Sequence, residues 1–149
     1  MGIYTFAPGS TAAAPNAGVT LDGQTQLKIE LGVAAEWFQQ PNNKNLTVRL
    51  IGAERFDNGA GGFCQILIDT ALTPTTADLT TYTIALNSMT LAQPCNGGGF
   101  TSGVTTLEQA LARPIGEVHV QAVYPQVNTT VLGGPEYPTG FTRGSVTFE

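Results

Sequence analysis

Apolar and polar residues alternate along much of the chain, which is the pattern of half-buried β-strands. Leu27, Ile29 and Leu31 alternate with Lys28 and Glu30, so the three aliphatic side chains share one face of an extended strand. Similar alternating or β-branched runs lie at 46–51, 79–86, 118–124 and 146–148. The spacing of these runs predicts a sheet protein.

A denser apolar run at 63–68 predicts a strand that is covered on both sides. The 18 Gly and 9 Pro residues interrupt the chain too often for long helices. One helix is predicted over 106–113, with Thr105 and Glu108 forming a capping box and Pro114 ending it. Residues 33–39 fit a second short helix or a strand equally well. Turn-forming residues separate the runs at 41–43, 57–59, 94–99 and 133–135.

These patterns predict an all-β fold, an antiparallel β-sandwich or jelly roll with one short helix at about 105–113. A length of 149 residues fits a single domain. The stretch 8–18 is rich in Pro, Gly, Ala and Thr and has too little large apolar surface for a core of its own. We therefore predict an extended N-terminal arm over 1–24 and a single sandwich domain over 25–149.

The charge of the chain excludes several partners. Charged residues make up 11% of the chain, against about 25% in an average soluble protein. The net charge is -5, and the six basic residues are scattered, so no basic face for direct nucleic-acid binding is expected. No run approaches the roughly 20 apolar residues that span a bilayer, so membrane insertion is not expected.

The chain start and the cysteines bear on the compartment. The start has no basic residue and no long apolar run, so we expect synthesis in the cytosol; the alternative is that a leader was removed. Cys64 and Cys95 are 31 positions apart. They could close a disulfide loop worth about 3 to 4 kcal/mol in an oxidising compartment, or remain two buried thiols.

Candidate chemistry is sparse. His119 is predicted to share a strand face with Glu117 and Gln121, but an acid–base pair of this kind also needs a nucleophile, and no motif supplies one. The glycines at 97–99 match no phosphate-binding pattern and predict a flexible loop. We therefore expect no catalysis and no cofactor or metal. We expect His119 to lie on a polar face of the sheet.

An aromatic platform for sugar rings is a further hypothesis. Trp37, Tyr124 and Tyr137 are the side chains that could form it, although core packing is the commoner use of large aromatic residues.

The sequence thus favours a non-enzymatic structural protein that assembles with other subunits in a shell, fibre or homo-oligomer. In composition it is similar to the small decoration, minor capsid or tail proteins of phage virions, and a virion location is expected. The arm would add a strand to an open sheet edge of a neighbour. The alternative is a secreted, extracellular module that binds carbohydrate or a surface, or a pilin-like fibre subunit. The arm residues expected to contact the partner are Ile3, Tyr4, Phe6, Pro8, Pro15 and Val19.

Overall fold

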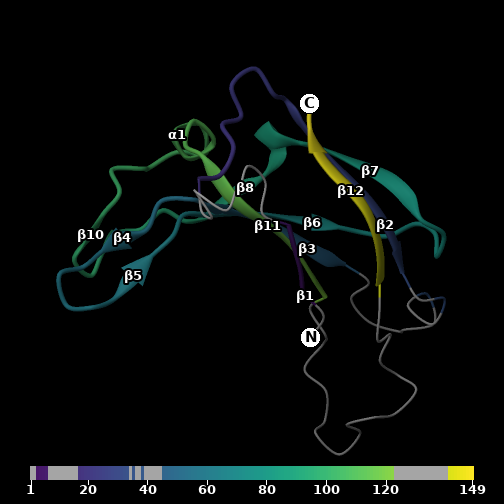
Figure 1. Cartoon of the computed structure of the whole chain (residues 1–149), viewed down its shortest axis with the longest axis horizontal. Helices are drawn as coiled ribbons and strands as arrows, with labels where there is room; N and C mark the ends of the chain where they lie inside the picture. Colours follow the sequence, from purple (N-terminus) through teal and green to yellow (C-terminus); the bar gives the residue numbers. More distant parts are fainter. Residues whose placement is uncertain (1–2, 7–16, 34, 36–37, 39–44, 123–140) are drawn as a thin grey trace, which may run out of the picture.

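Two antiparallel sheets form the body of the protein in the computed structural model (Figure 1). The structure describes residues 3–6, 17–33, 35, 38, 45–122 and 141–149. The larger sheet has the strand order β1 (Ile3–Phe6), β11 (Ile115–Ala122), β3 (Leu46–Gly52), β6 (Leu67–Leu72) and β8 (Thr90–Gln93). The smaller sheet has the order β12 (Phe141–Phe148), β2 (Gln26–Val33) and β7 (Thr80–Ala85).

One hydrophobic core joins the two sheets. Leu50, Ile68 and Val118 of the larger sheet are 0% exposed, and Leu27 and Ile29 of the smaller sheet belong to the same buried cluster. Burial alternates along β3, where every second side chain enters the core, as the sequence pattern predicts. The all-β sandwich prediction is confirmed.

Two short hairpins extend from one end of the long axis of the molecule (Figure 1). The first pairs β4 (Phe56–Asp57) with β5 (Phe63–Cys64), and the second pairs β9 (Asn96–Gly97) with β10 (Phe100–Thr101). We call this part, residues 54–64 and 95–103, the hairpin lobe. In place of the predicted flexible loop, Gly98 (φ +60°) and Gly99 (φ +90°) form a two-residue hairpin turn that needs positive φ at both positions.

The prediction of one covered strand over 63–68 is wrong. Residues 63–64 belong to β5, and the chain enters β6 only at Leu67. Between them, the Gln65 side chain donates a hydrogen bond to the Gly52 carbonyl (2.8 Å) and Gly52 donates its N–H to the Ile66 carbonyl (2.9 Å). These bonds turn the chain out of the sandwich, so Phe63 is 57% exposed although Ile66 is buried.

The predicted helix is present but shorter, and its cap lies one residue later. Helix α1 (Leu107–Leu111) has Thr106 as N-cap: the Thr106 hydroxyl accepts the Gln109 N–H (3.2 Å). The Gln109 side-chain oxygen accepts the N–H of Thr106 in return (3.3 Å), so glutamine and not Glu108 completes the capping box. Thr105 donates both its N–H (2.8 Å) and its hydroxyl (3.1 Å) to the same Gln109 oxygen but accepts no N–H of the helix. A 3-10 turn, η2 (Leu86–Ser88), lies between β7 and β8.

The N-terminal segment is joined to the sandwich at two points. β1 pairs with β11, and Val19 forms a bridge to Ile115 in which each residue donates its N–H to the other's carbonyl at 2.9 Å. Leu21 is 6% exposed and belongs to the core cluster. The last residues of the predicted arm thus contribute to the sandwich domain.

Candidate functional site

The edge of the larger sheet is the first candidate site, because the N-terminal strand is added there. β1 pairs with β11 at four positions in antiparallel register: Ile3 with Gln121, Tyr4 with Val120, Thr5 with His119, and Phe6 with Val118. This is strand addition to a sheet edge, and the edge belongs to the same chain. Of the predicted partner-binding residues, Pro8 and Pro15 lie outside the described residues, whereas Val19 is bridged to Ile115.

A row of ionisable side chains crosses the outer face of the same sheet. His119, Arg49 and Asp69 are successive register partners on β11, β3 and β6. The Arg49 guanidinium donates two hydrogen bonds to the Asp69 carboxylate, at 2.8 and 2.7 Å. The hydrogen bond to Asp69 raises the pKa of Arg49 and so favours its charged form.

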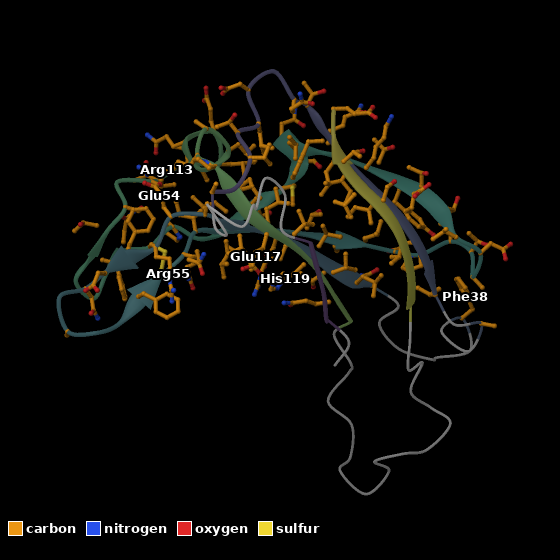
Figure 2. The ribbon with its side chains drawn as sticks, in the orientation of Figure 1. Phe38, Glu54, Arg55, Arg113, Glu117 and His119 are labelled. Carbon is orange, nitrogen blue, oxygen red and sulfur yellow. A yellow bond between two sulfur atoms is a disulfide. The ribbon has the colours of Figure 1, made fainter. Side chains whose placement is uncertain are left out.

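His119 and Glu117 form the second pair of this row. The His119 Nε2 lies 2.7 Å from a Glu117 carboxylate oxygen, and the side chains are 18% and 38% exposed (Figure 2). The predicted common face of these two residues is thus observed. Nucleophilic catalysis would also need a hydroxyl or thiol hydrogen-bonded to the imidazole, and no such group within the described ranges is bonded to His119. The arrangement orients an imidazole on a sheet face beside a carboxylate.

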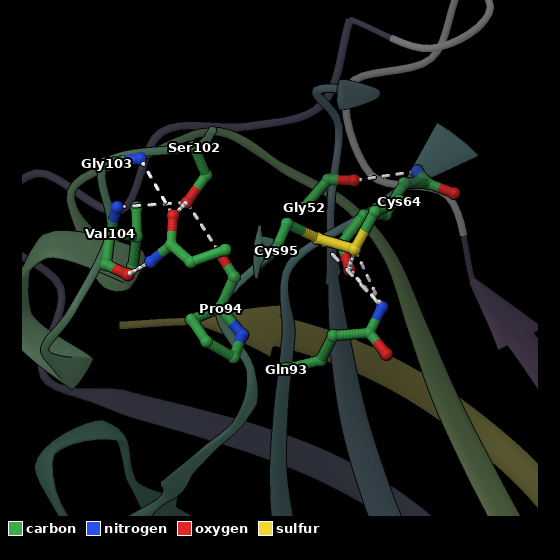
Figure 3. The surroundings of a disulfide bond; sticks show 10 residues. Gly52, Cys64, Gln93, Pro94, Cys95, Ser102, Gly103 and Val104 are labelled. Atoms are coloured by element: carbon green, nitrogen blue, oxygen red, sulfur yellow. Dashed lines mark hydrogen bonds between the residues drawn. A yellow bond between two sulfur atoms is a disulfide. The ribbon is translucent and has the colours of Figure 1, made fainter. Parts of the chain in front are cut away.

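The two cysteines are joined in a disulfide that ties the two hairpins together (Figure 3). Cys64 and Cys95 have a Cα–Cα distance of 5.7 Å, within the usual range for such bonds. Gln93 donates from its side-chain amide to the Gln65 carbonyl (2.9 Å) beside the sulfur atoms. Both thiols are consumed, so neither is available as a nucleophile or a metal ligand.

A buried hydroxyl supports the second hairpin. Ser102 is 5% exposed, and its hydroxyl accepts the Val104 N–H (2.9 Å) and donates to the Pro94 carbonyl (Figure 3). Asn96 holds the same turn by accepting the Gly103 N–H (3.2 Å). These bonds satisfy backbone groups that the short strands leave unpaired, which is a structural role.

The hairpin lobe carries two contacts between arginine and an aromatic ring. The Arg55 guanidinium lies 3.6 Å from the centre of the exposed Phe63 ring, and Arg113 lies 5.6 Å from that of Phe56 (Figure 2). Arg113 also pairs with Glu54. Stacking of this kind leaves N–H groups of the guanidinium free to bind a carboxylate.

Sequence reasoning missed both the stacked Arg55 and the Arg49–Asp69 pair. The sequence did carry a signal for the Arg49–Asp69 pair, because each residue occupies a polar position in a strand. Their register depends on the strand order, which the sequence pattern does not give. No local signal marked Arg55 and Phe63, since the eight-position gap between them is closed by a hairpin.

The residues of the predicted aromatic platform, Trp37, Tyr124 and Tyr137, lie outside the described residues. Phe38 is described, and it is half-buried against the core. The predicted turn at 57–59 is present and belongs to the β4–β5 hairpin: Asp57 accepts the Gly59 N–H (2.6 Å) and Asn58 accepts the Gly62 N–H (2.9 Å).

No three His, Cys, Asp or Glu side chains of the described ranges come together in a way that could hold a metal ion. Helices long and apolar enough to cross a membrane are absent from the same part of the chain. No protein-family model, no curated protein and no solved structure matches this sequence.

Proposed function

We propose that this protein is a non-enzymatic structural subunit that joins copies of itself by exchange of the N-terminal strand. The observation that supports the proposal is the position of β1, which forms the outermost strand of the larger sheet through four residue pairs with β11. The same pairs can form between two chains, because every copy presents an identical β11 edge. Exchange of an identical element is a low-cost route to assembly.

The length of the connection permits such an exchange. Ten residues, 7–16, separate β1 from the described segment that begins at Ala17. Fully extended, they reach at most about 35 Å, which is enough to cross to an adjacent subunit. Because the exchanged and unexchanged forms contain the same strand pairs, the protein concentration and the contacts between subunits decide which form is populated.

The disulfide and the low charge suit a subunit exposed outside the cell. Disulfides persist in oxidising surroundings, which include the surfaces of virions and cells. With 11% charged residues, the chain also buries few ionic groups when surfaces meet, so the desolvation cost is small. A phage decoration, minor capsid or tail protein has this combination of requirements, and we propose a virion location.

Mixed cysteine variants test strand exchange. Ile3 and Gln121 are register partners in β1 and β11, and facing Cα atoms in an antiparallel pair lie about 4.5 to 5.5 Å apart, close enough for a disulfide. A chain with Ile3→Cys is equilibrated at high concentration with a chain carrying Gln121→Cys, and the mixture is then oxidised. Strand exchange predicts a covalent dimer of one chain of each kind on a non-reducing gel.

Two controls make the result decisive. The double variant Ile3→Cys/Gln121→Cys, oxidised at low concentration, should give a cross-linked monomer and so confirm the register. Mixing Ile3→Cys with Thr83→Cys, an exposed position on β7 of the smaller sheet, should give no specific dimer. A cross-linked monomer from the double variant, without any mixed dimer from the separate chains, would show that β1 stays on its own sheet and would contradict the proposal.

A second candidate function is a secreted module that binds carbohydrate or a surface, or a pilin-like fibre subunit. The disulfide and the 57% exposed ring of Phe63 favour it, because exposed aromatic rings stack on sugars. Affinity electrophoresis in polysaccharide gels tests this function. Retardation that Phe63→Ala abolishes and Leu79→Ala preserves would support it, and no retardation in any gel would count against it.

A further inference from the structure

The two large apolar side chains that are exposed in the described part of the chain lie at opposite ends of the molecule. They are Phe63, 57% exposed, and Leu79, 51% exposed. Phe63 belongs to β5 in the hairpin lobe, and Leu79 directly precedes β7 in the turn from β6. Figure 1 shows the β4–β5 hairpin at one end of the longest axis and this turn at the other.

The lobe end combines an exposed ring with a cation. Arg55 stacks on Phe63 (3.6 Å), whereas the other described Lys and Arg side chains, Lys28, Arg49 and Arg113, each form an ion pair. Arg55 is thus the cation of the described part that has no carboxylate partner there. Aromatic rings and arginines are the side chains most enriched in protein interfaces.

The lobe presents these two side chains on a fixed frame. The disulfide links the two hairpins, and their turns touch: a β-carbon at Gly99 would lie 3.1 Å from the Asn58 carbonyl oxygen. Asp57, the register partner of Phe63, accepts the Gly59 N–H of its own turn. A surface that is already ordered loses less entropy on binding.

The opposite end combines an exposed aliphatic side chain with an anion. Asp78, next to Leu79, is exposed and forms no ion pair with any cation that the structure describes. The turn is also fixed: the Asp78 N–H donates to the Thr76 hydroxyl (3.2 Å), and the Thr75 N–H donates to the Tyr82 hydroxyl (3.0 Å). Each end therefore carries an exposed apolar group beside a charge without an ion-pair partner among the described residues, Arg55 at the lobe and Asp78 at the turn, and these two charges are opposite. The lobe also carries the exposed carboxylate of Asp57, which is bonded to its own turn.

We propose that the hairpin lobe of one chain binds the β6–β7 turn of a second copy of this chain. Phe63 packs on Leu79 of the next subunit, and Arg55 donates to its Asp78. Different surfaces meet in this contact, so the association is heterologous and builds a ring or an open filament. The inference rests on the proposed structural role and adds a second, independent contact to strand exchange.

Charge reversal at either end provides the test. Arg55→Asp places two anions in the contact, and Asp78→Arg places two cations there, so each variant alone should associate at least about tenfold more weakly than the original chain. In an equimolar mixture, every contact between unlike chains again joins one cation and one anion. We therefore expect the mixture to recover the association, with the two variants alternating along the assembly.

Sedimentation velocity over a concentration series measures the outcome. The matched control is Asp22→Arg, which reverses an exposed carboxylate that belongs to neither the hairpin lobe nor the β6–β7 turn and should leave association unchanged. The unaltered chain staying at 15.6 kDa at every concentration would overturn the proposal. Undiminished association of the two single variants would overturn it too, as would a mixture that fails to recover.

Ile3→Cys and Gln121→Cys, introduced into separate charge-reversed chains that are then mixed and oxidised, report strand exchange separately. Loss of assembly on charge reversal with the mixed cross-link intact is the result expected of two independent contacts. If charge reversal abolished both the mixed cross-link and the assembly, the lobe and the turn would form no contact independent of strand exchange, and the inference would be overturned.

Discussion

The sandwich and the hairpin lobe are held together by different forces. In the sandwich, facing sheets bury a shared set of aliphatic side chains such as Leu50 and Ile68, both 0% exposed. In the lobe, two-residue strands have no facing sheet. Cys64 and Cys95 are buried and Phe56 and Phe100 pack against the core cluster, and a disulfide, side-chain-capped turns and arginine–ring contacts hold the rest of the lobe. Burial thus dominates in the sandwich, whereas covalent and polar contacts add to a smaller buried area in the lobe.

The difference also separates the side chains that stabilise the fold from those that stay exposed for contact with another chain. A core side chain contributes by leaving water, at about 25 cal/mol per Å² of apolar surface. Phe63 stays more than half exposed, so little of that energy is gained within one chain and it remains available for a contact between chains. The predictions below test whether the two regions can be perturbed separately.

The largest effect is expected in the core. Leu50→Ala truncates a fully buried side chain of β3, the central strand of the larger sheet, and should lower the free energy of unfolding by about 2 to 5 kcal/mol. Leu79→Ala is the matched control, because its side chain is 51% exposed and the change should stay within about 0.5 kcal/mol. Urea denaturation measures both values. Equal losses would contradict the assignment of Leu50 to the core and of Leu79 to the surface.

The next effect is expected from the disulfide. Replacing both cysteines by serine, Cys64→Ser/Cys95→Ser, should lower the free energy of unfolding by about 3 to 4 kcal/mol, because the bond closes a loop with a sequence separation of 31. Hydrogen exchange should accelerate first in residues 54–64 and 95–103, while β3 and β11 keep their protection. Uniform acceleration across the chain would mean that the lobe and the sandwich unfold as one unit.

A smaller effect is expected at α1, which connects the lobe to β11. Thr106→Ala removes the N-cap hydroxyl and should cost about 1 kcal/mol, whereas Thr105→Ala should cost only a few tenths. Thermal or urea unfolding of the two variants distinguishes the observed cap from the one that the sequence pattern favoured. A larger loss for Thr105→Ala would place the cap where the sequence predicted it.

The smallest effect concerns a polar contact of the smaller sheet. The Glu30 carboxylate accepts the backbone N–H and the hydroxyl of Ser145 (2.7 and 2.8 Å), at a bulge between β2 and β12. These bonds, the backbone one first, lower the pKa of Glu30 below its ordinary value. The contact therefore stabilises the fold above the ordinary glutamate pKa, and this contribution is lost as the pH falls through the lowered one.

Ser145→Ala tests this contact. It removes the hydroxyl but keeps the N–H, so the pKa of Glu30 should rise part of the way back. An NMR titration of the carboxyl carbon measures it, and an unchanged pKa would show that the hydroxyl contributes nothing.

The sequence predicted the sandwich much better than the lobe. Alternation at Leu27, Ile29 and Leu31 located β2, because one buried face imposes a period of two on the residues. The lobe breaks that rule: Phe63 and Ile66 belong to one apolar run, yet the bonds of Gln65 and Gly52 turn the chain between them. Such bends depend on a partner strand that is distant in sequence, so no local pattern contains them.

The candidate contacts were foreseen only in part. The composition of the N-terminal segment led to the expectation that it adds a strand to the sheet edge of a neighbour, whereas in the structure β1 lies on the β11 edge of its own chain, in a register that depends on the strand order. Arg55 and Phe63 carried no signal, because their contact exists only once β4 and β5 have paired.

The mass of the intact chain in solution tests the proposed assembly most directly. Sedimentation velocity from about 10 µM to about 1 mM covers the range in which contacts of modest affinity between subunits form. We predict a weight-average mass that rises with concentration above the 15.6 kDa of one chain. A mass that stays at 15.6 kDa throughout would contradict a protein built to contact copies of itself.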